Sequence, residues 1–253
     1  MIDLATWLMV FLRASAMLSI FPVFSISNIP VQLRLALGAL LAYLVAPGLP
    51  PAALATGSLI ALVLQMLVEI ATGLLLCFVG RMLFYALDAA GAIIAAEIGL
   101  TLPSVMNPMG EATATAPGLI LNYLAALLWL SLDFHHWMLV SWQQTYQVLP
   151  IGGAHLHAAL LSDLIARSGQ LLVIAVLLTA PIIAVSFAIS LVFAVLGRAV
   201  PQMNVFSESF AVRLLVGLTV FGLTLQLMAQ HMLNYLRRLP DDILRMAQLL
   251  GGS

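Results

Sequence analysis

Long uncharged apolar stretches dominate the sequence. No Asp, Glu, Lys or Arg occurs in residues 14–33, 35–68, 112–132, 134–162, 168–197 and 214–236. A helix that spans a bilayer needs about 20 mostly apolar residues. Runs such as Leu171–Leu178 are apolar on all sides and lack the alternation of a barrel strand, so helices are expected. The pattern therefore predicts an all-α, helical integral-membrane protein.

About six long helices in hairpins are expected between the breaks in this pattern. Their predicted bounds are about Leu4–Phe21, Val31–Val45, Ser58 to beyond Arg81, Gly118–Leu149, Ser162–Leu196 and Phe210–Leu239. Proline should end the first helix at Pro22 and kink the fifth at Pro181. A short amphipathic tail, Asp241–Leu250, is expected after the last helix. The longest Pro- and Gly-bearing interruption is Asn107–Gly118.

Composition narrows the functional class. The chain has 253 residues, of which 63% are hydrophobic and 8% charged, against about 45–50% and about 25% in soluble domains. A soluble enzyme, a disordered chain and a nucleic-acid binder are therefore excluded. All nine basic residues are arginine, which excludes lysine chemistry, and the single Cys77 leaves no intrachain disulfide. The first 25 residues lack the features of a cleaved signal peptide.

The arginines give no preferred orientation. With the N-terminus outside and six spanning helices, four arginines fall inside (Arg34, Arg81, Arg198 and Arg213) and four outside (Arg167, Arg237, Arg238 and Arg245). Simple polytopic proteins show a bias toward the inside. The tie suggests that some of these helices are not conventional membrane spans.

The third apolar element carries Glu69, Arg81, Asp88 and Glu97. A charge at the bilayer centre costs about 2.5–3.5 kcal/mol on insertion scales. Either the membrane part ends near Arg81 and a juxtamembrane helix follows, or an inward face pairs with charges on other subunits, or a carboxylate relays protons. An unpaired Glu69 would be costly, so we expect a hydrogen-bonding or arginine partner for it within an assembly.

Adjacent His135 and His136 raise a metal or proton-shuttle hypothesis. Adjacent positions on a helix point to different faces, whereas ligand pairs use i,i+3 or i,i+4 spacing. A polar helix end near a membrane interface is favoured, with Trp129, Trp137 and Trp142 as interface aromatics. No metal, cofactor or catalytic residue is expected.

Small residues recur in the third apolar element, among them Gly73, Gly80, Gly91 and Gly99. Such residues let helix backbones approach closely. They indicate either ordinary packing within the chain or a surface built for other apolar helices.

One loop motif resembles a known family. Arg198-Ala199-Val200-Pro201-Gln202-Met203-Asn204-Val205-Phe206, followed by an apolar helix, is similar to the signature of the FliR family of flagellar biosynthetic export-gate proteins, which are related to the SctT subunits of type III secretion systems. Further family-like features follow in order along essentially the whole chain: Arg13, Pro22-Val23-Phe24, Pro30 with Arg34, Glu69 with Gly73, Gly91, Gly99-Leu100, Pro108, His135, Leu149–Gly153 and Pro181–Ile183. Departures are Asn107, Asp133-Phe134 and Ala211, where the family often has Asp, a small residue and Pro.

The resemblance implies a non-enzymatic subunit of the flagellar type III export gate, located in the bacterial inner membrane within the flagellar basal body. A FliP-like part at about 1–160 would be joined to a FliQ-like hairpin and tail at about 161–253. FliP-type and FliQ-type subunits would be the partners, with FlhB- and FlhA-type proteins nearby. The complex would contact membrane lipid and pass unfolded flagellar proteins through a helical pore.

Three groups of residues have expected roles, the first from the resemblance and the other two from the residues themselves. A plug loop near 103–116 would contain Val105, Met106, Asn107, Pro108, Met109, Gly110 and Thr113, although a plain connector is the alternative. A hairpin tip that faces the cytoplasm would contain Arg198, Pro201, Gln202, Asn204 and Phe206. Polar contacts within the membrane or between subunits would involve Arg13, Arg34, Glu69 and Arg81.

Three other functions remain open. The first is a small-molecule or ion transporter with Glu69 and Arg81 at a midplane site, although the inverted repeats typical of such folds are not evident. The second is a purely structural membrane anchor. The third is an export-gate subunit of an injectisome rather than of a flagellum.

Overall fold

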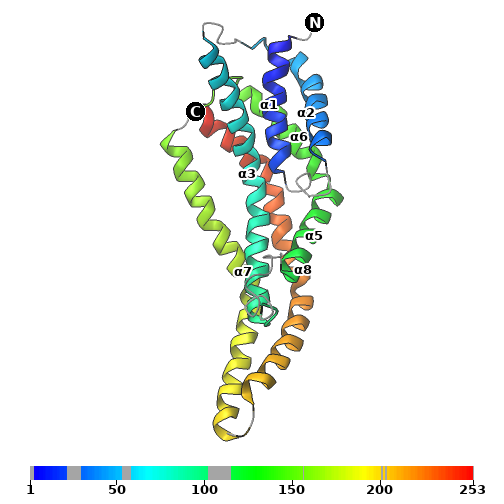
Figure 1. Ribbon diagram of the computed structural model, residues 1–253, viewed down its shortest axis with the longest axis vertical. Helices are drawn as coiled ribbons and strands as arrows, with labels where there is room; N and C mark the ends of the chain where they lie inside the picture. Colours follow the sequence, from blue (N-terminus) through cyan, green and yellow to red (C-terminus); the bar gives the residue numbers. More distant parts are fainter. Residues whose placement is uncertain are drawn as a thin grey trace. The chain divides into compact units, whose positions relative to one another are not determined.

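The computed structural model describes residues 3–21, 30–52, 58–101, 115–155, 157–200, 202 and 204–252 (Figure 1). These ranges hold α-helices and one 3-10 turn, and they contain no β-strand, so the predicted all-α class is confirmed. The elements are α1 (Leu4–Ile20), α2 (Val31–Val45), η1 (Ala46–Gly48), α3 (Leu59–Glu97), α5 (Ala116–Ser131), α6 (Phe134–Val148), α7 (Ala158–Ala199) and α8 (Val205–Gly251).

The first three helices follow the apolar pattern closely. Helices α1 and α2 match their predicted bounds to within one residue. Asp3 accepts a hydrogen bond from the backbone N–H of Thr6 at 3.2 Å and so caps α1. Helix α3 runs on through Arg81 without a break, so Asp88 lies in the same helix as Glu69.

The expected fourth helix is two helices, which corrects the prediction of one. Helices α5 and α6 are separated at Leu132 and Asp133. Asp133 has φ +55°, in the left-handed region. A right-handed helix cannot continue through such a residue, and Asp is one of the few non-glycine residues that adopt this conformation readily.

The expected C-terminal tail is also corrected. Asp241–Leu250 is not a separate piece, because α8 continues through Pro240 to Gly251. Proline removes one backbone hydrogen bond from a helix interior. Buried Leu236, Leu239, Ile243 and Met246 hold the segment on both sides of Pro240 to the rest of the molecule.

Among the residues that the structure describes, four elements are long and apolar enough to cross a membrane. They are the segment Val31–Gly48 and the helices α3, α7 and α8, and the pair α5–α6 makes a fifth if it forms one broken span. Helices of this kind are characteristic of integral membrane proteins. The chain is therefore a helical membrane protein.

The chain forms two compact units. Unit 1 comprises Met1–Leu83, Trp129–Ser168 and Tyr235–Ser253, and unit 2 comprises Phe84–Leu128 and Gly169–Asn234. The division into FliP-like and FliQ-like parts near residue 160 concerns relationship to other proteins, and it stays a prediction.

Unit 1 is built around α1. Helices α1 and α2 lie side by side, and a Cβ at Gly38 of α2 would collide with Ser15 of α1 (Figure 1). Trp129 and Trp142 are both 1% exposed, so they belong to this core. Their predicted place at a membrane interface is wrong, and Trp137, which is 60% exposed, is the only one of the three tryptophans available there.

Unit 2 brings the end of α3 against α5. A Cβ at Gly91 would collide with the backbone of Gly118, so the two helices cross in direct backbone contact. Next to this crossing, the Asn122 side-chain amide donates to Asp88 Oδ1 at 2.6 Å. The glycines therefore serve packing within this chain, as one of the two interpretations of the small residues predicts.

Candidate functional site

A buried ion pair joins α1 to α3. Arg13 Nε lies 2.7 Å from Glu69 Oε2, and Arg13 Nη2 donates to Glu69 Oε1 at 3.1 Å. Both side chains are fully buried. The two parallel bonds of guanidinium to carboxylate form the strongest common geometry for such a pair. The partner expected for Glu69 is thus an arginine of the same chain.

The turn after α6 completes this cluster. Glu69 Oε1 also accepts a hydrogen bond from Gly152 N at 2.8 Å, and Arg13 Nη1 donates to Leu149 O at 3.2 Å. The guanidinium carbon of Arg13 lies 4.3 Å from the centre of the Tyr146 ring, in cation–π range. The cluster ties α1, α3, α6 and the following turn together.

Glycine makes the turn and the approach possible. Gly152 has φ +78°, a left-handed conformation in which L side chains are strained, and a Cβ there would lie 2.8 Å from Gln65 Nε2. On α3, a Cβ at Gly73 would collide with the carbonyl oxygen of Arg13. The close backbone approach at Gly73 therefore brings Glu69, one helical turn away, within reach of Arg13.

This cluster of buried polar groups stabilises the packing of α1, α3 and α6. Both oxygens of Glu69 accept hydrogen bonds, from Arg13 and from a backbone N–H. Buried charges persist in proteins when they are paired in this way. The pairing could not be read from the sequence, because a lone charge in each of two apolar helices indicates that a partner is needed but not which one.

A second charge cluster links the start of α7 to the end of α8. Arg167 bonds Asp163 on its own helix and lies 2.9 Å from Asp242 on α8, while Arg245 lies 3.4 Å from Asp163. This network was not among the contacts expected from the sequence. The spacing of Asp163 and Arg167 is the i,i+4 signal that could have found its first half.

Arg34 and Arg81, the other residues predicted to make polar contacts, lie apart from the ion pair of Arg13 and Glu69. Arg81 Nη1 donates to Ile20 O at 2.9 Å and so satisfies a carbonyl at the C-terminal end of α1. Arg34 lies in the first turn of α2, where its backbone N–H donates to Pro30 O at 3.4 Å. The transporter hypothesis places Glu69 and Arg81 together, but the hydrogen bonds described for them go to different groups.

The predicted hairpin tip is partly described. Arg198 lies in the last turn of α7, and both Arg198 and Gln202 are exposed. Asn204 begins α8 as its cap, because its Oδ1 accepts from Ser207 N at 3.3 Å. Pro201 and the side chain of Phe206 lie outside the described residues, so their role as part of the tip stays a prediction.

The predicted plug residues also lie outside the described residues. They are Val105, Met106, Asn107, Pro108, Met109, Gly110 and Thr113. At the C-terminal edge of this segment, Thr115 directly precedes α5, and Leu119 N donates to Thr115 O at 2.9 Å. The plug role stays a prediction.

Comparison with known proteins identifies the family. The family described as "Bacterial export proteins, family 1" matches residues 4–239, which is most of the chain. The chain belongs to this family. The resemblance drawn from the loop at Arg198–Phe206 is thereby confirmed.

Individual relatives agree over nearly the whole length. The flagellar biosynthetic protein FliR of Pectobacterium carotovorum is 32% identical over 243 residues, covering 92% of this chain and 90% of the relative. FliR of Escherichia coli K12 is 28% identical over 239 residues, with the same coverage. FliR of Bacillus subtilis is 26% identical over 215 residues, covering 83% of this chain and 82% of the relative.

Proposed function

We propose that this protein forms part of the wall of a helical export pore, together with FliP-type and FliQ-type subunits in the bacterial inner membrane. Membership of the export family with FliR relatives makes it a subunit of the flagellar export apparatus. Unfolded flagellar proteins are the proposed substrates. FlhB- and FlhA-type proteins are proposed as neighbours.

The observation that carries the proposal is the length of the exposed apolar surface on α7. Within unit 2, large apolar side chains on α7 that are at least 51% exposed occur from Leu172 to Val195, including Val176, Phe187 and Val192. The 23 residue steps from Leu172 to Val195 correspond to about 35 Å of helix, whereas the hydrocarbon core of a bilayer is about 30 Å thick. The exposed apolar surface is longer than the hydrocarbon core, which favours apolar partner helices that cover part of it.

The test is assembly with defined partners. Co-expression with FliP-type and FliQ-type proteins should give a discrete complex. Val192→Arg, at a side chain that is 56% exposed, should reduce recovery of that complex severalfold. The matched control is Gln170→Arg on the same helix, because position 170 is exposed and already polar, and this variant should assemble normally.

Two results would contradict the proposal. One is a monodisperse monomer that does not join these partners. The other is equal recovery of the complex from Val192→Arg and from wild type, since the exposed apolar face of α7 would then have no role in assembly.

We also propose that the turn between α7 and α8 faces the cytoplasm. The support is the exposed Arg198 at the end of α7, because short cytoplasmic segments are rich in arginine. Arg198→Glu should reduce export more than it reduces protein level. In a Cys77→Ala background, labelling of Gln202→Cys by an impermeant reagent from the periplasmic side would contradict this orientation.

The transporter hypothesis has no comparable support. Its proposed site paired Glu69 with Arg81, but Glu69 is bonded by Arg13 and by Gly152 N, and Arg81 bonds Ile20 O. A transport assay with the purified protein in vesicles would detect the activity directly.

A further inference from the structure

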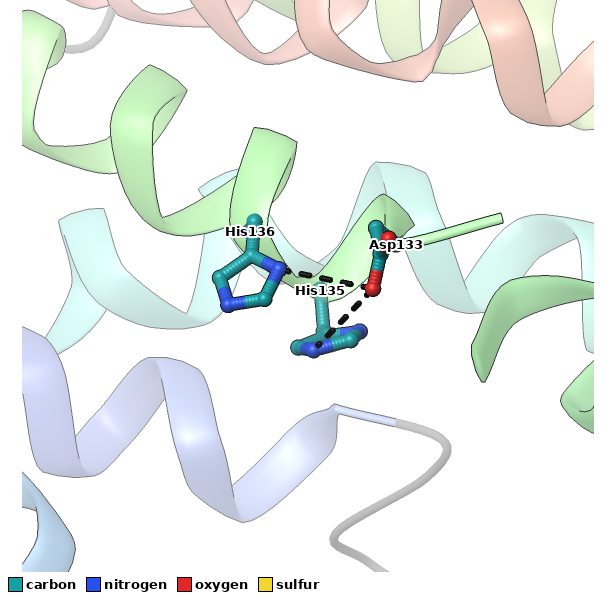
Figure 2. A group of neighbouring side chains, drawn as sticks. All are labelled: Asp133, His135 and His136. Carbon is teal, nitrogen blue, oxygen red and sulfur yellow. Dashed lines mark ion pairs between the residues drawn. The ribbon is translucent and has the colours of Figure 1, made fainter. Parts of the chain in front are cut away.

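Three metal-ligating side chains meet at the start of α6 (Figure 2). Asp133 Oδ1 lies 3.9 Å from His135 Nε2 and 3.6 Å from His136 Nδ1, and the three donor atoms all lie within 4.8 Å of one another. The two imidazole rings have centroids 4.1 Å apart. The expectation that adjacent histidines point to different faces is therefore wrong here.

The backbone holds this cluster in place. Asp133 N donates to Leu130 O at 3.3 Å, and Asp133 O accepts from His136 N at 2.9 Å. Phe134 is 9% exposed, and its ring centroid lies 6.0 Å from that of Trp129. The buried Phe134 thus holds the first turn of α6 against the core of unit 1. The side chains of Asp133 and His136 are 70% and 69% exposed.

The carboxylate of Asp133 is turned away from its usual task. An Asp that precedes a helix normally accepts a hydrogen bond from a backbone N–H of the first turn. Asp133 makes no such bond, and its carboxylate faces the two imidazoles instead. Because Nδ1 of His135 is buried, Nε2 is the nitrogen that this ring presents to the cluster.

We propose that Asp133, His135 and His136 bind a divalent transition-metal ion such as Zn²⁺, with water completing its coordination. Zinc bonds to His nitrogen and carboxylate oxygen are about 2.0–2.2 Å long, so tetrahedral ligand atoms stand about 3.4 Å apart. The separations of 3.6 and 3.9 Å exceed that value by about 0.2–0.5 Å, and all three donor atoms lie within 4.8 Å of one another. The exposed side chains of Asp133 and His136 can move to close the difference.

The donor set also selects the class of metal. Imidazole suits Zn²⁺, Ni²⁺ and Cu²⁺, whereas Mg²⁺ and Ca²⁺ prefer oxygen ligands. The site lies within unit 1, and it does not depend on the proposed export function. A bound ion would cross-link the residue before α6 to the first turn of that helix and so stabilise it.

Cobalt(II) is a suitable probe because its visible absorption reports coordination by nitrogen and oxygen. The full-length protein, without a polyhistidine tag, would be purified in detergent at pH 7.5 with whatever partners remain bound. We expect saturable binding of one Co²⁺ per chain, displaced by Zn²⁺ and not by Mg²⁺. Asp133→Asn and His136→Ala should each weaken binding at least about tenfold, since each removes one of three protein ligands.

The matched control is the double variant His155→Ala/His157→Ala, in which two other histidines with ring centroids 6.3 Å apart are removed. It should bind Co²⁺ as wild type does. Zn²⁺ should also raise the melting temperature of wild type but not of Asp133→Asn, because a ligand that binds the folded state stabilises it.

Several outcomes would overturn the site. One is Co²⁺ binding by wild type no stronger than by the triple variant Asp133→Asn/His135→Ala/His136→Ala, which would leave a simple contact between a carboxylate and two imidazoles. Another is loss of binding in the His155/His157 control. Without Zn²⁺, Asp133→Asn should melt at the same temperature as wild type, which would show that the variant is folded and that its weaker binding comes from the lost ligand.

Discussion

Removing the carboxylate of Glu69 should destabilise unit 1 strongly. Glu69→Leu leaves three donors without an acceptor, namely the buried Nε and Nη2 of Arg13 and the part-buried N–H of Gly152. Glu69→Gln keeps one carbonyl oxygen but removes the charge and turns an amide NH₂ toward a donor. The double variant Arg13→Met/Glu69→Leu removes both charges and fills the space with apolar atoms.

The magnitudes follow from the burial of both groups. Breaking a fully buried pair by removing one partner costs about 3–5 kcal/mol, so Glu69→Leu should lower the melting temperature by roughly 6–20 °C at about 2–4 °C per kcal/mol. Glu69→Gln should cost about 1.5–3 kcal/mol, as for a lost hydrogen bond to a charged group. The double variant should be more stable than Glu69→Leu alone, because no uncompensated charge remains.

The assay is thermal unfolding in detergent, followed by tryptophan fluorescence. Trp129 and Trp142 are buried in unit 1 and report on its packing. Glu208→Leu is the control, because Glu208 is exposed at the start of α8, and surface changes of this kind cost no more than about 0.5 kcal/mol.

The reasoning would be refuted by additivity. If the double variant lost as much stability as the sum of the losses in Arg13→Met and in Glu69→Leu, Arg13 and Glu69 would not interact. Residues in contact show coupling energies of about 0.5–3 kcal/mol. Full tolerance of Glu69→Leu would equally show that Glu69 is not buried in the protein.

Three further predictions concern packing and helix ends. Gly91→Leu should cost at least about 1–3 kcal/mol by forcing α3 away from α5, whereas Gly222→Leu, with open space around it, should be tolerated in a melting assay. Asn204→Ala should cost about 1 kcal/mol through loss of the α8 cap and speed proteolysis at the adjoining turn, and Asn204→Asp should restore protection. Hydrogen bonds from Thr6 lower the pKa of Asp3 below its ordinary 3.8. The stabilisation by these bonds should therefore be present above pH 3.8 and be lost as the pH falls through the lowered pKa. The ¹³C shift of the Asp3 carboxyl should titrate at that lower midpoint, and Thr6→Val should return the midpoint toward 3.8.

The sequence predicted those helix limits that local chemistry sets. Helix α1 ends where Phe21 precedes Pro22, and α2 begins directly after Pro30, because proline interrupts backbone hydrogen bonding. The break between α5 and α6 was missed because it rests on the conformation of one residue, Asp133 at φ +55°. No proline or glycine marks that position, so an apolar run on both sides looks continuous.

The buried pair shows a different limit. The apolar neighbours of Glu69 predicted that it needs a partner, yet the chain contains nine arginines. The one that bonds it, Arg13, is 56 residues away. The choice depends on the close backbone approach at Gly73 and on the turn at Gly152, and both arise only once the helices have packed.

The polar residues that the sequence offered for contacts between subunits make their described bonds within the chain. Arg13 and Glu69 bond one another, and Arg81 bonds Ile20 O. The close approach at Gly91 is likewise made to α5 of the same chain. Buried bonds of this kind are costly to exchange for bonds to another protein, because a donor left unpaired during the exchange loses its full desolvation energy. The exposed apolar side chains of α7, proposed above as a surface for partner subunits, would gain packing on association without breaking a polar contact. That assignment makes Val192→Arg a sharper probe of assembly than any change to the buried ion pair, whose loss would weaken the fold and the assembly together.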